Sequence, residues 1–305
     1  MKLHLIIFYQ EVTILYNNNT SMNQPTLIKK ASGEMEPFSS EKLEESLKRV
    51  GADKETIGRI SDEISNWLHE GVSTKKIYKQ AFRLLKKHKT GSAARYKLKK
   101  AIMELGPTGY PFERFIGELI RHHGFDVKVG EMVQGQCVQH EVDVLATGNN
   151  KQIFVECKFY NSQGKHANVK VPLYINSRVN DIIRKRESLP EFSKMTFQGW
   201  VVTNTRFTSD AVDYGKCAGL HLVSWNYPRG HSLREMIEKE GFFPVTALTT
   251  LNKLQKQTLL DDGIVLVRQI CDDPGVANRL EINPQKIKNL MEEVKNICNC
   301  GKCNG

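Results

Sequence analysis

Two acidic residues and one lysine in the middle of the chain have types and spacing suited to metal-assisted hydrolysis. Asp143 lies in the apolar segment 140–146, and Glu156 and Lys158 lie in segment 153–160. Alternate residues of a strand point to the same face, so Glu156 and Lys158 project together while Cys157 faces away. Two carboxylates can hold Mg²⁺, which prefers oxygen ligands, and a lysine can stabilise developing charge. The pattern therefore predicts a Mg²⁺ site able to hydrolyse phosphodiesters.

The two segments are expected to form a hairpin. Both are rich in apolar, β-branched and aromatic residues, and the turn-forming residues 147–151 separate them. The run Ile153, Phe154 and Val155 indicates a central strand. The alternative interpretation is a strand-end aspartate beside a solvated edge, because so short a pattern also occurs by chance.

The order of the neighbouring motifs is more specific than this pattern alone. Segments 109–113, 124–127, 140–144, 155–158, 199–204 and 207–208 follow one another, and Ala211 comes after them. Over residues 108–226 the chain resembles a restriction-endonuclease-like PD-(D/E)xK domain of the Mrr-type branch. Val142 stands where the family name implies a proline. The resemblance implies an α/β fold with a mixed sheet flanked by helices, DNA as substrate, and Glu113 as a further residue of the metal site.

Glu113 lies in a segment that is expected to be helical. Pro111 suits a first helical turn, and Glu113 lies beside an apolar stripe with helical spacing, formed by Phe112, Phe115, Ile116, Leu119 and Ile120. Glu113 either joins the metal site, as the resemblance implies, or only interacts favourably with the positive end of the helix dipole.

The N-terminal part predicts a strand and turn over 27–33, followed by a helix after Ser39, a plausible N-cap. Further helices are expected around 53–69, 73–88 and 93–105. Over residues 25–105 this arrangement resembles an ATP-cone, which implies binding of ATP or dATP. Lys30 and Lys42 would neutralise phosphate charge, and backbone donors near Gly33 would add hydrogen bonds. The first turn departs from the usual Lys-Arg-Asp-Gly, so a basic helical domain without a ligand is the alternative.

The C-terminal part is expected to be helical over 244–297. The Gly263–Ile264 turn is compatible with a helix-hairpin-helix-like module that binds the DNA backbone, and a plain packing module is the alternative. Residues 298–305 form a tail with Cys298, Cys300 and Cys303. Three thiols are one ligand short of a closed zinc site, so a frayed tail is expected.

The composition favours a polyanionic partner. The net charge is +10, and clusters 86–89 and 184–186 either contact phosphates or form solvated helix faces. No apolar run approaches the roughly 18 residues of a membrane span. Residues 1–24 are expected to be a disordered extension. Seven scattered cysteines favour reduced thiols and a cytoplasmic location.

These observations predict an ATP-cone-like domain over 25–105, a nuclease domain over 106–243 and a helical region over 244–297. The main hypothesis is a Mg²⁺-dependent DNA endonuclease of a restriction or repair type, regulated by ATP or dATP. The alternative is a nucleotide-responsive DNA-binding regulator whose nuclease fold is catalytically silent. Cutting both strands of a duplex usually needs two active sites, which is consistent with a homodimer.

Overall fold

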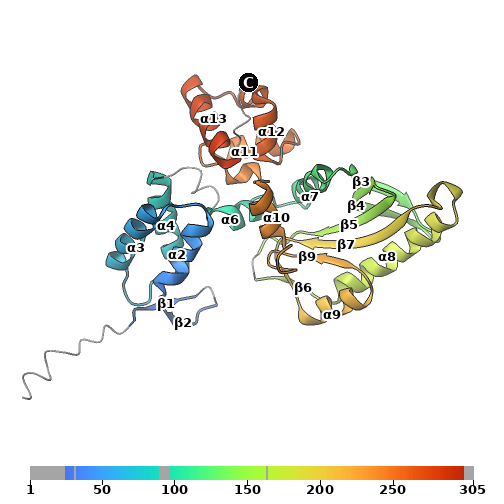
Figure 1. Ribbon diagram of the computed structural model, residues 1–305, viewed down its shortest axis with the longest axis horizontal. Helices are drawn as coiled ribbons and strands as arrows, with labels where there is room; N and C mark the ends of the chain where they lie inside the picture. Colours follow the sequence, from blue (N-terminus) through green and yellow to red (C-terminus); the bar gives the residue numbers. More distant parts are fainter. Residues whose placement is uncertain (1–24, 31, 89–95, 163, 299–305) are drawn as a thin grey trace, which may run out of the picture. The chain divides into compact units, whose positions relative to one another are not determined.

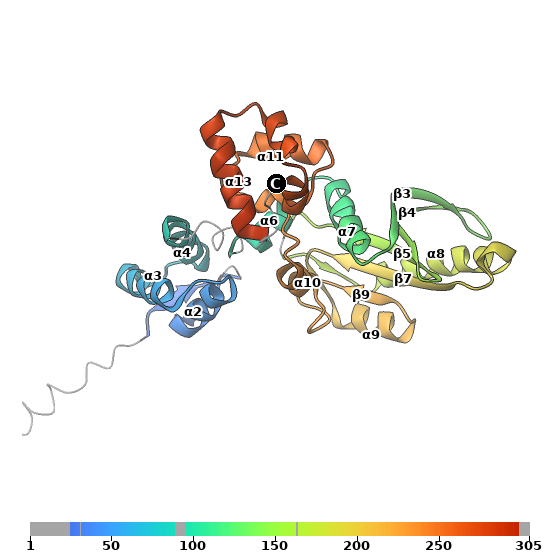
Figure 2. The ribbon, with the colours of Figure 1, turned by 45° about the horizontal axis from the view of Figure 1, so that its top comes forward.

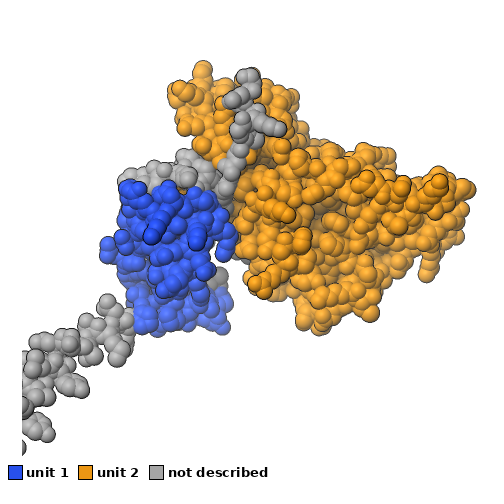
Figure 3. Space-filling model, viewed as in Figure 1, with its two compact units in different colours: residues 1–84 blue, residues 85–305 orange. Residues whose placement is uncertain are grey.

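The computed structural model describes residues 25–30, 32–88, 96–162 and 164–298. The predicted N-terminal extension and the tail beyond Cys298 lie outside the described residues. The chain divides into two compact units, residues 1–84 and 85–305 (Figure 3). Within the described residues, no helix combines the length and the apolar character that crossing a membrane requires.

The first unit is a small hairpin with helices. Strands β1 and β2 pair antiparallel, and helices α2, α3 and α4 follow them; the bounds are β1 Leu27–Lys29, β2 Met35–Pro37, α2 Ser40–Arg49, α3 Lys54–Trp67 and α4 Thr74–His88 (Figure 1). The Ser39 side chain accepts a hydrogen bond from the Lys42 amide, so Ser39 is the N-cap of α2, as the sequence predicts. Leu47 of α2 and Ile60 of α3 are fully buried, so each helix packs its apolar face into the core of this unit.

The second unit is built on a five-stranded mixed sheet with the order β3-β4-β5-β7-β9. Strands β3, β4 and β5 pair antiparallel, whereas β5, β7 and β9 pair parallel. Their bounds are β3 Asp126–Gln134, β4 Gln139–Gly148, β5 Lys151–Lys158, β7 Thr196–Thr203 and β9 His221–Val223. The predicted α/β class with a mixed sheet is confirmed, and β5 is its central strand.

The hairpin between β4 and β5 is tighter than the sequence indicates. The strands extend to Gly148 and from Lys151, so the turn is Asn149–Asn150 and not the whole of 147–151. Both asparagines have positive φ, 52° and 54°. This is the backbone of a two-residue turn that matches the twist of the strands, and asparagine tolerates it better than most residues.

Helices cover both faces of the sheet. Helix α7 lies on one face, and α8 and α9 lie on the other (Figures 1 and 2); their bounds are α7 Tyr110–His122, α8 Lys170–Glu187 and α9 Ser209–Cys217. Alternation along β5 supplies both cores: Val155 packs in the core with α7, and Phe154 packs in the core with α8. The short pair β6 His166–Ala167 and β8 Arg206–Phe207 and the 3-10 turn η1 Pro190–Phe192 complete this part.

The C-terminal helices share the α7 core. They are α10 Leu233–Glu240, α11 Lys253–Asp261, α12 Val267–Asp272 and α13 Pro284–Cys298, with the 3-10 segments η2 Val245–Ala247 and η3 Pro274–Leu280. Helix α6, Leu98–Met103, buries Leu98 and Ile102 in the same core. The two compact units divide at Leu84–Leu85, near the end of α4, so α6 belongs to the second unit and its apolar face joins the core of that unit. The expected domain boundary at residue 105 stays a prediction.

The Gly263–Ile264 turn already satisfies its own backbone. The amides of Asp262, Gly263 and Ile264 donate to carbonyl groups of α11. A Cβ added at Gly263 would lie 2.0 Å from Arg114 Nη1, so the turn faces α7. These amides are therefore not available as donors to a DNA backbone. DNA binding by a helix-hairpin-helix-like module stays a prediction.

The cysteines differ from the expectation in one respect. Cys271 on α12 is a disulfide cysteine, so the expectation of reduced thiols does not hold for it. Cys137, Cys157 and Cys217 are free thiols. Cys300 and Cys303 lie outside the described residues.

Gly117 allows α7 to lie close to the sheet. A Cβ at Gly117 would be 3.0 Å from Val129 Cγ2 and 3.3 Å from Val127 Cγ1. Gly117→Leu is expected to lower the free energy of unfolding by about 1–3 kcal/mol because the added side chain overpacks this interface. Thermal denaturation measures the effect. Gly58→Leu is the matched control, since Gly58 lies within helix α3 with nothing within 4 Å of an added Cβ; an equal loss in both variants would contradict the packing argument.

Candidate active site

The candidate site lies where β4 and β5 stop pairing. The last paired residues at this end are Val144 and Val155. Beyond them, the Asp143 carboxylate accepts a hydrogen bond of 2.7 Å from the Cys157 amide. A side chain thus takes the place of a backbone carbonyl in the sheet. This satisfies a buried amide and also fixes the position of the carboxylate.

Strand β4 changes its face at the same residue. Val144 packs in the core with α7, but Val142, two residues earlier, packs in the core with α8. On β3 the residue between the paired neighbours is Gly130, which has a positive φ of 68°. The two strands therefore rotate together at Gly130 and Asp143, and a glycine permits the required backbone conformation.

Glu156 is buried, with 7% of its surface exposed, and two cations contact it. Arg178 Nη1 lies 2.8 Å from Glu156 Oε2, and Lys158 Nζ pairs with Glu156 Oε1. Lys158 therefore projects on the same side as Glu156, as strand alternation predicts. Burial alone would lower the pKa of Lys158, but the hydrogen bond and charge of Glu156 outweigh it and raise that pKa.

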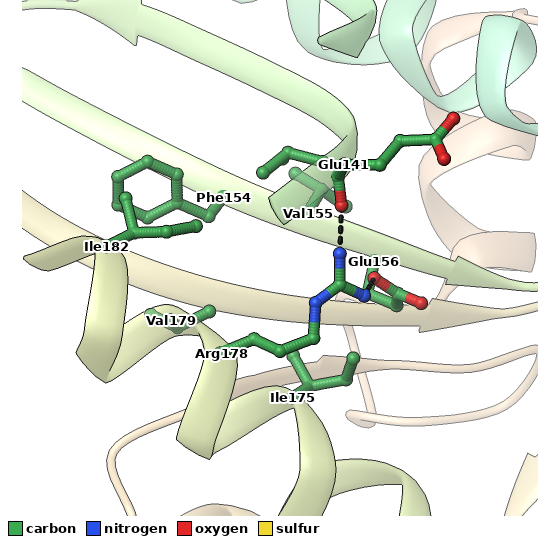
Figure 4. Close-up of a pocket in the computed structure, with 9 residues that line it drawn as sticks. Glu141, Phe154, Val155, Glu156, Ile175, Arg178, Val179 and Ile182 are labelled. Atoms are coloured by element: carbon green, nitrogen blue, oxygen red, sulfur yellow. Dashed lines mark hydrogen bonds and ion pairs between the residues drawn. The ribbon is translucent and has the colours of Figure 1, made fainter. Parts of the chain in front are cut away.

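Arg178 is a site residue that the sequence did not indicate. It comes from α8 and donates both to Glu156 and to the backbone carbonyl of Glu141, so it connects β4 to β5 (Figure 4). Its guanidinium also lies 5.4 Å from the centre of the Tyr174 ring. The hollow beside these residues has a volume of about 10 Å³, which is enough for about one water molecule and too small for a substrate.

Glu113 shares the electrostatic environment of the acidic pair. It lies in the first turn of α7. Burial and the negative charges of Asp143, Glu141 and Glu156 raise its pKa to about 7. Burial and Glu156 likewise raise the pKa of Asp143 to about 6, against the lowering effects of the Cys157 amide, Lys158 and Arg178. The structure thus brings Glu113, Asp143, Glu156 and Lys158 into one site.

The donor set fits a magnesium ion by type. Asp143, Glu156 and Glu113 offer carboxylate oxygens, and Mg²⁺ is commonly held by one or two carboxylates while it keeps several waters. Among the described residues, no group of three His, Cys, Asp or Glu side chains is arranged to hold a metal ion as it stands. Glu156 is paired with Lys158 and Arg178, so metal binding would require it to exchange at least part of this pairing.

The segment after Lys158 is held by the end of β7. Thr203 Oγ1 donates to the Lys158 carbonyl at 2.7 Å. The Asn204 side chain accepts from the Tyr160 amide and donates to the Tyr160 carbonyl, both at 2.9 Å. Lys99 of α6 then donates to the Asn204 carbonyl at 2.6 Å. A chain of contacts therefore connects α6 to the strand that carries Glu156 and Lys158.

His140 has a structural partner. Its Nε2 lies 2.9 Å from Asp181 Oδ2 on α8. Asp181 also accepts hydrogen bonds from the Cys137 and Val138 amides, and the His140 contact leads the interactions that lower its pKa to about 2. His140 thus anchors the start of β4 to α8.

The residues predicted to bind nucleotide also lie together. Glu36 Oε2 lies 2.9 Å from Lys30 Nζ and 3.9 Å from Lys42 Nζ. Gly33 has a positive φ of 95°, and its amide donates to the Lys30 carbonyl at 3.0 Å. The two lysines therefore share one carboxylate beside the predicted turn.

The basic clusters are only partly described. Side chains of residues 86–89 lie outside the described part of the chain. In the last turn of α8, the Arg186 guanidinium stacks 4.3 Å from the centre of the Phe192 ring. At least this cation has a packing role within the protein, whereas Arg184 is exposed.

Two family models match parts of the second unit. Residues 106–227 match the family model described as restriction endonuclease (Mrr_cat), and residues 243–298 match the one described as AF1548-like, C-terminal. An uncharacterized protein of Archaeoglobus fulgidus is 28% identical over 183 residues, which are 60% of this chain and 99% of that protein.

Two solved structures resemble the chain to different degrees. A crystal structure of a protein of unknown function, AF1548, is 27% identical with a TM-score of 0.51 and covers 63% of this chain and 99% of its own. The MspJI restriction endonuclease in complex with a 27-mer oligonucleotide is 14% identical with a TM-score of 0.31, covering 57% of this chain and 36% of that one. Residues 106–227 thus have a restriction-endonuclease-like fold, with a mixed sheet flanked by helices.

The raised pKa of Asp143 predicts that its negative charge lowers the free energy of unfolding of the metal-free protein. A carboxyl whose pKa is higher in the folded state destabilises the fold once it ionises, so the penalty grows between about pH 4 and pH 6 and is complete above. Asp143→Asn keeps an acceptor for the Cys157 amide and removes the charge. At pH 7.5 it is expected to stabilise the metal-free protein by up to about 3 kcal/mol, and by little near pH 4.

Denaturant unfolding in the presence of a chelator at several pH values measures this difference. Asp213→Asn on the exposed face of α9 is the control and should show no comparable change with pH. A constant stability difference between wild type and Asp143→Asn across the range would count against a penalty from charge burial.

Proposed function

We propose that this protein is a metal-dependent deoxyribonuclease that hydrolyses phosphodiester bonds within DNA. Asp143 and Glu156 would hold Mg²⁺, with Glu113 assisting, and Lys158 would act in the hydrolytic step. The observation that carries the proposal is the convergence of these four side chains at one end of β4 and β5. This end lies within the residues that match a restriction endonuclease family.

The acidic residues of the site would bind the metal ion, and the basic residues would act on the phosphate or hold the acidic ones in place. When bound, Mg²⁺ lowers the pKa of a coordinated water and offsets charge on a phosphodiester. The partly buried carboxylates of Glu113 and Asp143 repel each other, and such a cation would relieve this repulsion. Lys158 lies on the same face as Glu156 and can stabilise negative charge on the reacting phosphate. Arg178 holds Glu156 in place from α8.

DNA is the substrate class that the charge favours. The net charge of +10 attracts a polyanion at long range, independently of its base sequence. The alternative is a DNA-binding regulator with an inactive nuclease fold. It gives no reason for the buried Glu156, the partly buried Asp143 and a lysine to meet where a sheet would otherwise continue its pairing, since burying such groups is costly.

Cleavage of supercoiled plasmid with Mg²⁺ tests the proposal. Wild type is expected to nick or linearise the plasmid, and Asp143→Ala and Lys158→Ala are each expected to lose at least about 100-fold in rate, because each removes a group that acts directly at the reacting phosphate. Asp213→Ala and Lys216→Ala, which alter exposed residues of α9, should keep wild-type activity.

Two outcomes would contradict the proposal. Equal cleavage by wild type, Asp143→Ala and Lys158→Ala would indicate that the activity comes from elsewhere. DNA binding without cleavage of any tested topology, methylated or not, would favour the regulator.

We further propose that the first unit binds ATP or dATP through Lys30 and Lys42. The supporting observation is that the two lysines converge on Glu36, a carboxylate that a nucleotide phosphate would replace. Nucleotide binding would then regulate the nuclease.

The shared carboxylate gives opposite predictions for two substitutions. Lys42→Gln should weaken ATP binding by about tenfold, while Glu36→Gln should strengthen it because the competing carboxylate is removed. Calorimetric titration of the full chain with ATP and dATP measures both. Lys54→Gln, at the exposed start of α3, is the control, and affinities that do not differ between these variants would exclude this site.

A further inference from the structure

The second unit contains a cavity of about 810 Å³ apart from the acidic site. Its wall is formed by α6 and the residues that follow it, by the loop after β5 and by η2 and α11; it includes Lys97, Glu104, Asn161, Thr246, Lys253 and Lys256. Cavities of this size hold small-molecule ligands in other proteins. Asn161 lies three residues beyond Lys158, so the cavity adjoins the loop that follows the acidic site.

The cavity wall carries an excess of positive charge. Among the described residues that line it, three are lysines and only Glu104 is acidic. Lys256 is buried, with 8% of its surface exposed, and the Lys97 side chain is 13% exposed. A buried ammonium group is costly unless a negative group compensates it.

The internal partners of these lysines leave that compensation incomplete. Lys256 Nζ and Lys97 Nζ both donate to the Thr246 carbonyl, at 2.9 and 3.3 Å. A carbonyl oxygen satisfies hydrogen bonds but carries no net charge. Lys97 also pairs with Glu104 at 3.1 Å, and Lys100 shares that carboxylate at 3.4 Å. Burial and the neighbouring Lys97 lower the pKa of Lys256 to about 7, as expected where cations are crowded.

We propose that this cavity binds a phosphate-class anion, held by Lys97, Lys253 and Lys256. The anion is either a free phosphorylated compound or a phosphate of the DNA backbone, and both offer the oxygen acceptors that ammonium groups bind. The ligand connects α6 to α11, since Lys97 immediately precedes α6 and the other two lysines lie on α11. None of the three belongs to the acidic site, so the proposal goes beyond the proposed function.

Binding without cleavage tests the proposal independently of the nuclease activity. The full chain is titrated with inorganic phosphate, pyrophosphate, ATP and a short DNA duplex in the presence of a chelator. Wild type is compared with Lys253→Gln and Lys256→Gln, and the matched control is Lys239→Gln at an exposed position of α10. Circular dichroism and the ligand-free Tm verify folding. Lys253→Gln keeps the test informative if the buried Lys256→Gln is unstable.

Each substitution in the cavity is expected to lower affinity by about tenfold for at least one ligand, while the control binds as wild type does. Reduced affinity for pyrophosphate or ATP would identify a free phosphorylated ligand, and reduced affinity for the duplex alone would identify a backbone phosphate. ATP bound by the first unit is recognised by its sensitivity to Lys42→Gln. Affinities for all four probes that match the control, or no binding of any probe, would overturn the proposal.

Discussion

The second unit depends on a carboxylate that occupies a place normally filled by a backbone carbonyl. Asp143 accepts the Cys157 amide where β4 and β5 stop pairing, and β3 and β4 rotate at the same point, with Gly130 in a left-handed conformation. The acidic group is therefore part of the sheet and not an addition to its edge. Its position follows from the hydrogen-bonding requirement of the buried backbone.

In both the acidic site and the predicted nucleotide site, the charged side chains form ion pairs with other side chains of the protein. Glu156 is paired with Lys158 and Arg178, and Lys30 and Lys42 share Glu36. The pairing stabilises the ligand-free protein at Glu156, which is buried. At Glu36 the partners are more exposed, so the pairing there contributes little to stability. A ligand at either site must replace an existing partner, so affinity reflects a difference between two sets of charge interactions and not the sum of new contacts.

The parts of the fold that the sequence predicted depend on local patterns. Alternation and the apolar run placed Glu156 and Lys158 on one face of a central strand, and the stripe after Pro111 placed Glu113 on a helix. Arg178 and Asn204 were not predicted, because they reach the site from α8 and the end of β7, and no spacing relates them to Glu156. The order of the strands brings them together, since β7 pairs with β5 across the α8 crossover. The place of α6 in this core was not predicted for a similar reason: its partners there lie far along the chain.

Helix α6 precedes the region that matches the endonuclease family, yet its residues Leu98, Ala101 and Ile102 belong to the core of that region's fold. Lys99 adds a contact with Asn204 and lies 4.4 Å from the centre of the Trp225 ring. The compact unit thus begins ahead of the region that matches the family model. A gene fusion that attached another N-terminal part at residue 106 would remove the apolar side chains of α6 from this core, whereas one made ahead of α6 would keep them.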